Sequence, residues 1–222
     1  MKTFDFLGSY VLDQLAKTYA VKELDLGGDA ALSKKGMHFF TKCYDVEGLG
    51  HLCVMTMNAM LGMMKMETVV LSVTGKDAPL INLDMVQAMG KETFMAEFYD
   101  DQLSPLPQEQ AAAYEALRQR DKDIPDYVSG PHWYDDIRYP FSYAKTGKGF
   151  TERFQAAGKA YFDEYLRQLA LLPACDREEK GAKVSAFAQT LYSQGGPAVD
   201  QVKNLFGDEI AGRLVKTHMY GC

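Results

Sequence analysis

Long apolar runs, an excess of positive charge and grouped cysteines are all missing from this 222-residue sequence. No stretch approaches the roughly 18 uninterrupted apolar residues of a membrane-spanning helix, so we expect no membrane partner. The 24 Lys and Arg against 30 Asp and Glu leave a net charge of −6, which argues against a protein that binds nucleic-acid phosphates. The first residues lack the apolar core of a secretory signal, so a cytoplasmic protein is expected.

The four cysteines occur singly, at positions 43, 53, 175 and 222, without a CxxC pair or a histidine at metal-ligand spacing. This spacing favours reduced thiols and predicts neither a metal site nor an iron–sulfur cluster. The sequence also has no GxGxxG opening a helix after a strand, no GxxxxGK(S/T), no GxSxG and no HExxH. These absences argue against a nicotinamide dehydrogenase, a P-loop NTPase, an α/β hydrolase and a zinc protease.

Apolar periodicity divides the chain into a strand-rich part, residues 36–100, and a helix-rich part, residues 107–220. Five apolar segments separated by short turns favour an antiparallel meander over βαβ units. The expected strands are 37–44, 51–57, 67–74, 80–89 and 92–99. The expected helices are 8–20, 108–120, 150–172, 177–192 and 197–218, with an aromatic loop over 121–148. We therefore predict one domain, residues 1–222, of the α+β class: an α/β/α sandwich with a central, mainly antiparallel sheet.

Two titratable side chains lie on expected strands that are otherwise apolar. Asp84 is embedded in the segment LINLDMV, where burial would raise the pKa of its carboxyl group and suit it to donate a proton near neutral pH. His51 begins the segment HLCVMTM, whose alternation places it on one face with Cys53 and Met55. On spacing alone both have a structural alternative: His51 as a hydrogen-bonded structural group, and Asp84 as a cap of the adjacent hairpin turn.

A set of short motifs over roughly residues 40 to 220 resembles the ferredoxin-dependent bilin reductases. In chain order they are Cys43-Tyr44, His51-Leu52, PL-x-x-x-D at residues 79–84, Trp133, Phe141-Ser142, GPA at 196–198 and LFG at 205–207. Each motif alone is weak, and their order and spacing together carry the resemblance.

That resemblance implies an open-chain tetrapyrrole, biliverdin or a related bilin, held between the sheet and the C-terminal helices. It implies an oxidoreductase that carries no flavin or metal, takes electrons one at a time from reduced ferredoxin and supplies the protons itself. Asp84 matches the family's central proton donor, and His51 matches a histidine that could hydrogen-bond a ring lactam or relay a proton. The substrate-binding residues expected on this basis are Cys53, Met55, Ser72, Asn82, Phe141 and Gly196.

The sequence departs from the family pattern at three of these positions. Ser72 stands where one subfamily has a second pocket histidine, Cys53 where that subfamily has an acid, and Gly196 where other subfamilies have a second catalytic aspartate. A bilin reductase with its own regiospecificity is the leading hypothesis. A tetrapyrrole-binding protein without catalysis is the first alternative. An α+β domain unrelated to pigments, in which Asp84 and His51 are structural, is the second.

Ferredoxins are acidic, and so is this chain, so docking requires a local basic patch. Lys145, Lys148 and Arg153, beside the aromatic loop, are the candidates for ferredoxin docking. Ordinary solvated charges are the alternative interpretation of these three residues.

Overall fold

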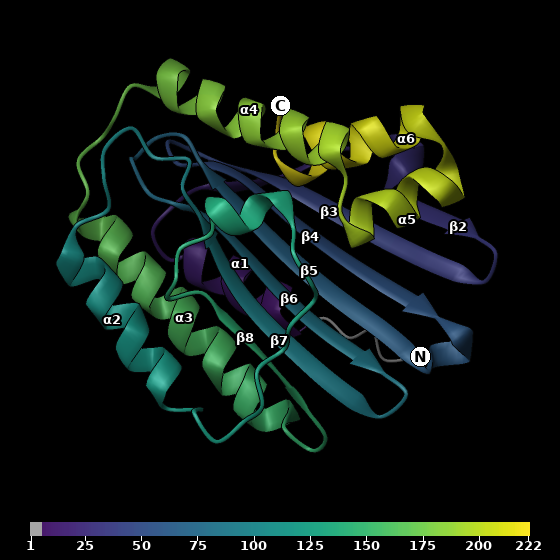
Figure 1. Cartoon of the computed structure of the whole chain (residues 1–222). Coiled ribbons are helices and arrows are strands. Elements are labelled where there is room, and N and C mark those ends of the chain that lie inside the picture. The colour runs from purple at the N-terminus through teal and green to yellow at the C-terminus, as the bar shows by residue number, and fades with distance from the viewer. Residues whose placement is uncertain (1–5) are drawn as a thin grey trace.

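The computed structural model describes residues 6–222 and shows an eight-stranded antiparallel sheet between two layers of helices (Figure 1). The strands pair in the order β1-β3-β4-β5-β6-β7-β8, and β2 pairs with the first half of β3. Their bounds are β1 Val21–Leu24, β2 Ala31–Lys34, β3 Met37–Val46, β4 Gly50–Ala59, β5 Met64–Val73, β6 Leu80–Ala88, β7 Lys91–Tyr99 and β8 Tyr143–Gly147. The predicted α/β/α sandwich around an antiparallel meander is therefore confirmed.

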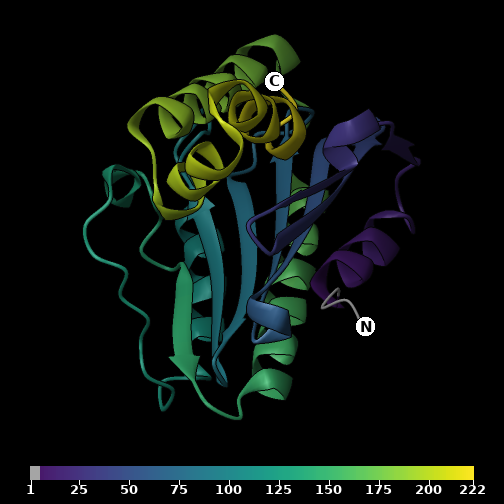
Figure 2. The ribbon, with the colours of Figure 1, turned by 90° about the vertical axis from the view of Figure 1, so that its right-hand side faces the viewer.

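Helices cover both faces of the sheet, as Figure 2 shows from the side. The back face is packed against α1 (Phe6–Leu15), α2 (Gln108–Gln119) and α3 (Thr151–Leu171). The front face lies under a roof made of α4 (Arg177–Gln194), α5 (Pro197–Phe206), α6 (Asp208–Gly212) and η4 (Arg213–Met219). The short helical turns are η1 (Gly27–Ala30), η2 (Met60–Gly62) and η3 (Trp133–Asp136). No helix in the described part of the chain is long and apolar enough to cross a membrane.

An aromatic core closes the back face. Alternation along β7 turns Phe94 and Phe98 toward this face, and both are completely buried. The ring centroid of Phe98 lies 4.5 Å from that of Tyr114 in α2 and 6.1 Å from that of Tyr161 in α3. Because aromatic side chains bury large apolar areas, this layer contributes a large share of the hydrophobic stabilisation.

Helix α1 is docked to the back face by one buried carboxylate. Glu67 of β5 accepts hydrogen bonds from the first three backbone amides of α1, at 3.0, 3.0 and 2.7 Å. These bonds satisfy N–H groups that have no partner inside the helix. A Cβ atom on Gly8 would lie 2.3 Å from Val54, so glycine is needed for the helix to approach the sheet this closely.

The structure differs from the sequence prediction in several element boundaries. The expected loop over 121–148 contains β8, which lies among prolines and aromatic residues that disguise a strand. Strands β1 and β2 have four residues each, too few to show a period. The helix expected over 8–20 ends at Leu15. The helix expected over 197–218 is broken at Gly207, whose φ of 85° lies in the left-handed region that favours glycine.

Candidate active site

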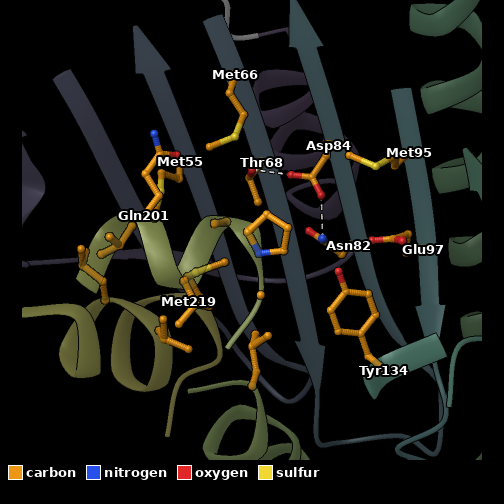
Figure 3. Close-up of a pocket in the computed structure, with 18 of the residues that line it drawn as sticks. Met55, Met66, Thr68, Asn82, Asp84, Met95, Glu97, Tyr134, Gln201 and Met219 are labelled. Carbon is orange, nitrogen blue, oxygen red and sulfur yellow. Dashed lines mark hydrogen bonds between the residues drawn. The ribbon is translucent and has the colours of Figure 1, made fainter. Parts of the chain in front are cut away.

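A cavity lies between the front face and the roof (Figure 3). Its floor comes from β3 to β7, its roof from α4, α5 and η4, and one wall from the loop that carries η3. It encloses about 1230 Å³ of space, including the part open to solvent. Apolar side chains dominate the lining, among them Phe39, Met55, Met66, Val86, Met95, Phe187, Leu191, Leu214 and Met219.

The carboxyl group of Asp84 lies on the floor of this cavity, in the middle of β6. Alternation turns Asn82 and Asp84 to the front face, while Ile81 and Leu83 enter the back-face core. The Thr68 hydroxyl of β5 donates a hydrogen bond to Asp84 Oδ1, and Asn82 Nδ2 donates to Oδ2 at 2.7 Å. Burial raises the pKa of Asp84 to about 7, although these two hydrogen bonds oppose the shift. This carboxyl group can therefore hold and release a proton near neutral pH.

A second carboxylate, Glu97, faces the same cavity from β7. It lies opposite Asn82 in the β6–β7 register, and its negative charge adds to the raised pKa of Asp84. The side chain is only 11% exposed. Arg138 Nη1 donates to Glu97 Oε1 at 2.8 Å, and the Tyr99 hydroxyl donates to Oε2 at 2.9 Å. The cavity thus holds two carboxyl groups in different settings, one paired with a cation and one not.

Contacts outside the lining fix the wall and the roof in place. Trp133 Nε1 in η3 donates to the carbonyl oxygen of Gly195, which ties the wall to the turn between α4 and α5 at 3.0 Å. Lys180 of α4 pairs with Asp101, after β7, at 2.7 Å, and both side chains are almost fully buried. Removal of one partner from a buried ion pair of this kind strongly destabilises the fold.

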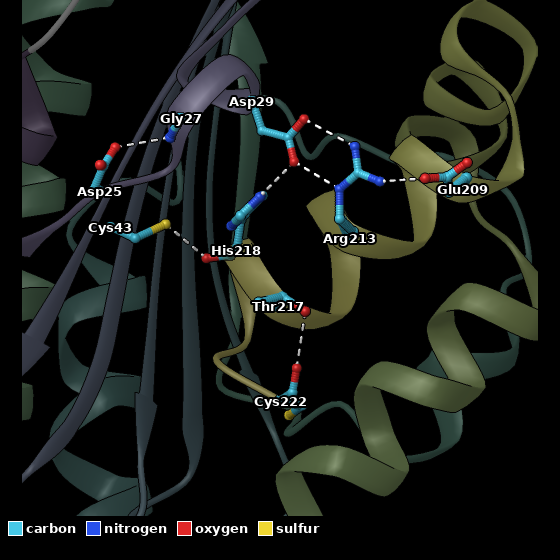
Figure 4. Close-up of polar contacts among 9 residues, drawn as sticks. All are labelled: Asp25, Gly27, Asp29, Cys43, Glu209, Arg213, Thr217, His218 and Cys222. Carbon is cyan, nitrogen blue, oxygen red and sulfur yellow. Dashed lines mark hydrogen bonds and ion pairs between the residues drawn. The ribbon is translucent and has the colours of Figure 1, made fainter.

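The roof is also clasped to the edge of the sheet by Asp29 in η1 (Figure 4). Arg213 Nε donates to Asp29 at 2.8 Å, and His218 Nε2 lies 3.0 Å from the same carboxylate. The pKa of Asp29 is lowered to about 2, chiefly because Arg213 hydrogen-bonds its charged form. Both partners come from η4, a seven-residue π-helix, and Leu214 and Met219 of this helix line the cavity. π-Helical segments are frequent at functional sites.

His51 lies outside the cavity lining, near the start of β4. Its Nε2 is 2.7 Å from the carbonyl oxygen of His218, and the Cys43 thiol donates to the same oxygen at 2.9 Å. Burial opposes the charged form of His51, but its contacts with Cys43 and with the His218 carbonyl raise its pKa overall. A hydrogen bond from Cys53 is the main reason why the pKa of Cys43 falls to about 6. These contacts fasten the C-terminal segment to the sheet and fit the structural interpretation of His51.

Three of the six expected substrate-binding residues line the cavity: Met55 from β4, Asn82 from β6 and Gly196 from the start of α5. The backbone of Gly196 is extended, with φ of 167°. A Cβ atom there would lie 3.6 Å from Tyr134 and 3.8 Å from Leu191, which are ordinary contact distances. A side chain would therefore fit at this position, and glycine is not required by the backbone.

The other three expected substrate-binding residues do not line the cavity. Cys53 is completely buried in the front-face core, and Ser72 is buried opposite His51 in the β4–β5 register. Phe141 lies on the back face, where its ring stacks on Tyr114 with centroids 4.9 Å apart. The aromatic core on that side of the sheet buries the ring and separates it from the cavity.

The three residues expected to dock ferredoxin do not form one free basic patch. Lys145 is buried and pairs with Asp126 at 2.7 Å. Arg153 forms ion pairs with Asp121 at 2.5 Å and with Asp123 at 2.7 Å. Their charges are thus compensated by nearby carboxylates that sequence spacing did not reveal. Lys148 is exposed, in the turn after β8.

Sequence reasoning missed Glu97, Thr68 and the loop residues Tyr134 and Arg138. Alternation along β7, which puts Glu97 on one face with Met95 and Tyr99, is the signal that could have found Glu97. The loop residues have no such periodicity, and only the tertiary structure brings Tyr134 to the cavity and Arg138 to Glu97. In residues 6–222 no group of three or more His, Cys, Asp or Glu side chains is placed to hold a metal ion.

The α/β/α fold matches the fold of a solved ferredoxin-dependent bilin reductase. Thirty-five chains among the solved structures match this chain. One of them is phytochromobilin synthase from tomato in complex with biliverdin, with a TM-score of 0.79 and 11% sequence identity over 99% of this chain and 83% of that one. No family model matches the sequence, and no curated protein matches it. At 11% identity this match concerns the fold alone, and it confirms the fold that the sequence motifs implied.

Proposed function

We propose that this protein is an oxidoreductase that reduces a linear tetrapyrrole, biliverdin or a related bilin, with electrons from reduced ferredoxin. The observation that carries the proposal is the Asp84 carboxyl group, which lies on the floor of a largely apolar cavity with a pKa raised to about 7. The shared fold with an enzyme that was solved with biliverdin bound supports the ligand class.

The reaction adds two electrons and two protons for each double bond reduced. Ferredoxin supplies the electrons singly, so each reduced bilin radical needs a proton donor within hydrogen-bond reach. Asp84 takes this role because its pKa lies near neutral pH, where a carboxyl group both holds a proton and transfers it readily. The Thr68 hydroxyl and the Asn82 amide orient the carboxyl group, and solvent returns the proton after each transfer.

The lining also supports an orientation for the ligand. Among residues 6–222 no lysine or arginine side chain lines the cavity, and two carboxyl groups, Asp84 and Glu97, do. The pyrrole N–H groups of a bilin therefore face this floor, and its propionate groups face solvent, where their charge stays hydrated. His51 takes no direct part in this arrangement, because it lies outside the lining.

Ferredoxin docking is assigned to three lysines at one end of the sheet: Lys65, Lys91 and Lys148. Lys91 begins β7 and Lys148 follows β8, and these strands are paired there through Glu92 and Gly147. None of the three lysines forms an ion pair with a carboxylate in the described part of the chain. Unpaired cations attract an acidic electron donor more strongly than the compensated charges of Lys145 and Arg153.

Tetrapyrrole binding without catalysis is the alternative function. Gly196 favours it, because this position borders the cavity without presenting the second acid that other subfamilies of the resembled family have there. Multiple turnovers under anaerobic reducing conditions would exclude a binding protein of this kind.

A visible absorption titration with biliverdin, followed by reduced ferredoxin without oxygen, tests both functions. A saturable spectral change and then a new pigment over several turnovers is the expected result. Binding without conversion would favour the alternative. No spectral change with biliverdin or other bilins would overturn both proposals and leave the fold alone as the likeness.

A further inference from the structure

A row of polar side chains crosses the front face at the level of Asp84 (Figure 3). Thr68 on β5 hydrogen-bonds Asp84 on β6, and Asn82 on β6 bonds the other oxygen of the same carboxyl group. Glu97 on β7 follows, directly opposite Asn82 in the register. Side chains of directly opposite residues on adjacent strands are close neighbours. The row therefore places Asn82, which hydrogen-bonds Asp84, directly opposite Glu97.

Glu97 is held firmly at the end of this row. Its two oxygens accept from Arg138 at 2.8 Å and from the Tyr99 hydroxyl at 2.9 Å. Arg138 is in turn held by Asp135, at 2.8 Å. The Asp135 carboxylate also accepts from the backbone amide of His132 at 2.7 Å. An ion pair with this second support keeps a negative charge at a defined place beside the cavity.

The Asn82 amide between the two carboxyl groups is only half satisfied. Its Nδ2 donates to Asp84 Oδ2 at 2.7 Å, while its Oδ1 is buried and has no hydrogen-bond partner among residues 6–222. Rotation of the amide by 180° would let Oδ1 accept a hydrogen bond from a protonated Asp84. Such a rotation exchanges nearly isosteric groups. The amide thus has one orientation suited to each proton state of Asp84.

We propose that Glu97 is a positioning residue for Asp84: its carboxylate, fixed by Arg138 and opposite Asn82 in the register, keeps the proton on Asp84 between transfers. This inference rests on the proposed function for its role in turnover, although its electrostatic part concerns the ligand-free protein. A fixed negative charge disfavours ionisation of a neighbouring carboxyl group. Asp84, once it has given its proton to a ligand radical, therefore recovers one from solvent more readily.

The other groups around Asp84 do not provide this charge. The Thr68 hydroxyl and the Asn82 amide hydrogen-bond the carboxylate and stabilise its charged form. The phenols of Tyr134, from η3, and Tyr220, after η4, lie near enough to interact with Asp84, but burial raises the pKa of both far above neutrality, so they stay uncharged. Among the described residues that line the cavity, Glu97 is thus the one other acidic side chain.

A pH titration of ligand-free protein with carbon-13-labelled aspartate, followed by NMR, tests the electrostatic part directly. The Asp84 signal is assigned by its loss in Asp84→Asn. In Glu97→Gln we expect the Asp84 midpoint to fall by roughly one pH unit or more. In Arg138→Gln, which leaves Glu97 without its counter-ion, the midpoint rises. Glu109→Gln, an exposed site in the first turn of α2, removes the same charge far from the cavity and leaves the midpoint unchanged.

An unchanged Asp84 midpoint in both Glu97→Gln and Arg138→Gln would overturn the inference. If Glu97→Gln does not fold, the Asp84 midpoint in Arg138→Gln alone decides the inference. Arg138 contacts Glu97 through one oxygen and otherwise pairs with Asp135. With biliverdin and reduced ferredoxin, Glu97→Gln should lose turnover at neutral pH and recover it at lower pH. A loss that is equal at all pH values would indicate a merely structural role. If the wild type shows no turnover, the proposed function fails. The NMR titration of ligand-free protein still tests whether Glu97 raises the Asp84 midpoint.

Discussion

On the back face of β7, Phe94 and Phe98 are completely buried, whereas on its front face Met95 and Glu97 border a cavity. Both pairs alternate along the same nine residues. The back face is sealed by aromatic rings from α2 and α3, and the front face is covered by a roof that leaves space for a ligand. One strand thus contributes to stability on one side and to chemistry on the other.

The difference between the two faces explains how the fold tolerates Asp84, a buried carboxyl group whose ionisation is unfavourable. Asp84 lies in an apolar strand, where its ionisation is unfavourable, and the strand remains because its other face is anchored in the aromatic core. Residues at functional sites are often destabilising in this way. Substitutions on the two faces should therefore have opposite consequences for activity and for stability.

The largest effect is expected from Asp84→Asn, which removes an acidic side chain of the front face. Loss of the proton donor should lower bilin turnover by about 100-fold or more, while bilin binding is retained. The free energy of unfolding should rise by up to about 4 kcal/mol at pH 8, as a buried group that resists ionisation is removed. Anaerobic turnover and urea denaturation measure the two quantities.

The pH dependence of Asp84 has a definite sign. Its pKa in the folded protein, about 7, is above the ordinary value of 3.8, so the folded state binds more protons than the unfolded state between these values. The stability of the wild type should therefore fall as the pH rises from 3.8 toward 7, and Asp84→Asn should lose this part of the pH dependence. Full turnover by Asp84→Asn would contradict its role as proton donor.

The next largest effect is expected on the back face, from Phe98→Ala. Removal of a completely buried ring that contacts Tyr114 and Tyr161 should cost about 3–5 kcal/mol of unfolding free energy. Met66→Ala is the matched front-face variant: its side chain is half-buried at the cavity and should cost about 1 kcal/mol. Urea denaturation compares them, and equal losses would mean that the two faces contribute alike.

The smallest effect is expected from Asp29→Asn, which weakens the contacts of the roof with Arg213 and His218 and leaves both sheet faces unchanged. The pKa of Asp29 is about 2 in the folded protein, below the ordinary 3.8, so its stabilising contacts are complete above 3.8 and are lost as the pH falls toward 2. Because Arg213 is partly exposed, the contribution is about 1 kcal/mol at neutral pH. Denaturation at pH 7 and pH 2 checks it: the variant should differ from the wild type at pH 7 and much less at pH 2.

Asp84 could be predicted from the sequence because a lone carboxylate in an apolar strand is visible in the alternation itself. Met55 and Asn82, which the resemblance implied as substrate-binding residues, both line the cavity. His51 shares the expected face of Met55, yet it lies near the start of β4, beneath the C-terminal segment. Alternation assigns a face of a strand, but it does not say which part of that face a helix will cover.

The expected site residues that the structure places elsewhere depend on contacts between distant segments of the chain. Lys145 and Arg153 look like free cations in the sequence, but the fold brings Asp126 and Asp121 to them. Phe141 belongs to one of the motifs behind the resemblance, but its ring is packed in the aromatic core on the back face. Ion pairs and core packing of this kind form across long stretches of chain, which local patterns do not encode.

The sequence by itself determined five of the eight strands, most of the helices and the acid at position 84, because periodicity and composition are properties of neighbours along the chain. The tertiary structure alone decided that Glu97 and Arg138 meet beside that acid, across the β7 edge and a loop without periodicity. It also decided that His51 holds the C-terminus instead of facing the cavity. The reason is physical: charge and burial depend on what lies within a few ångströms in space, whatever the separation in sequence.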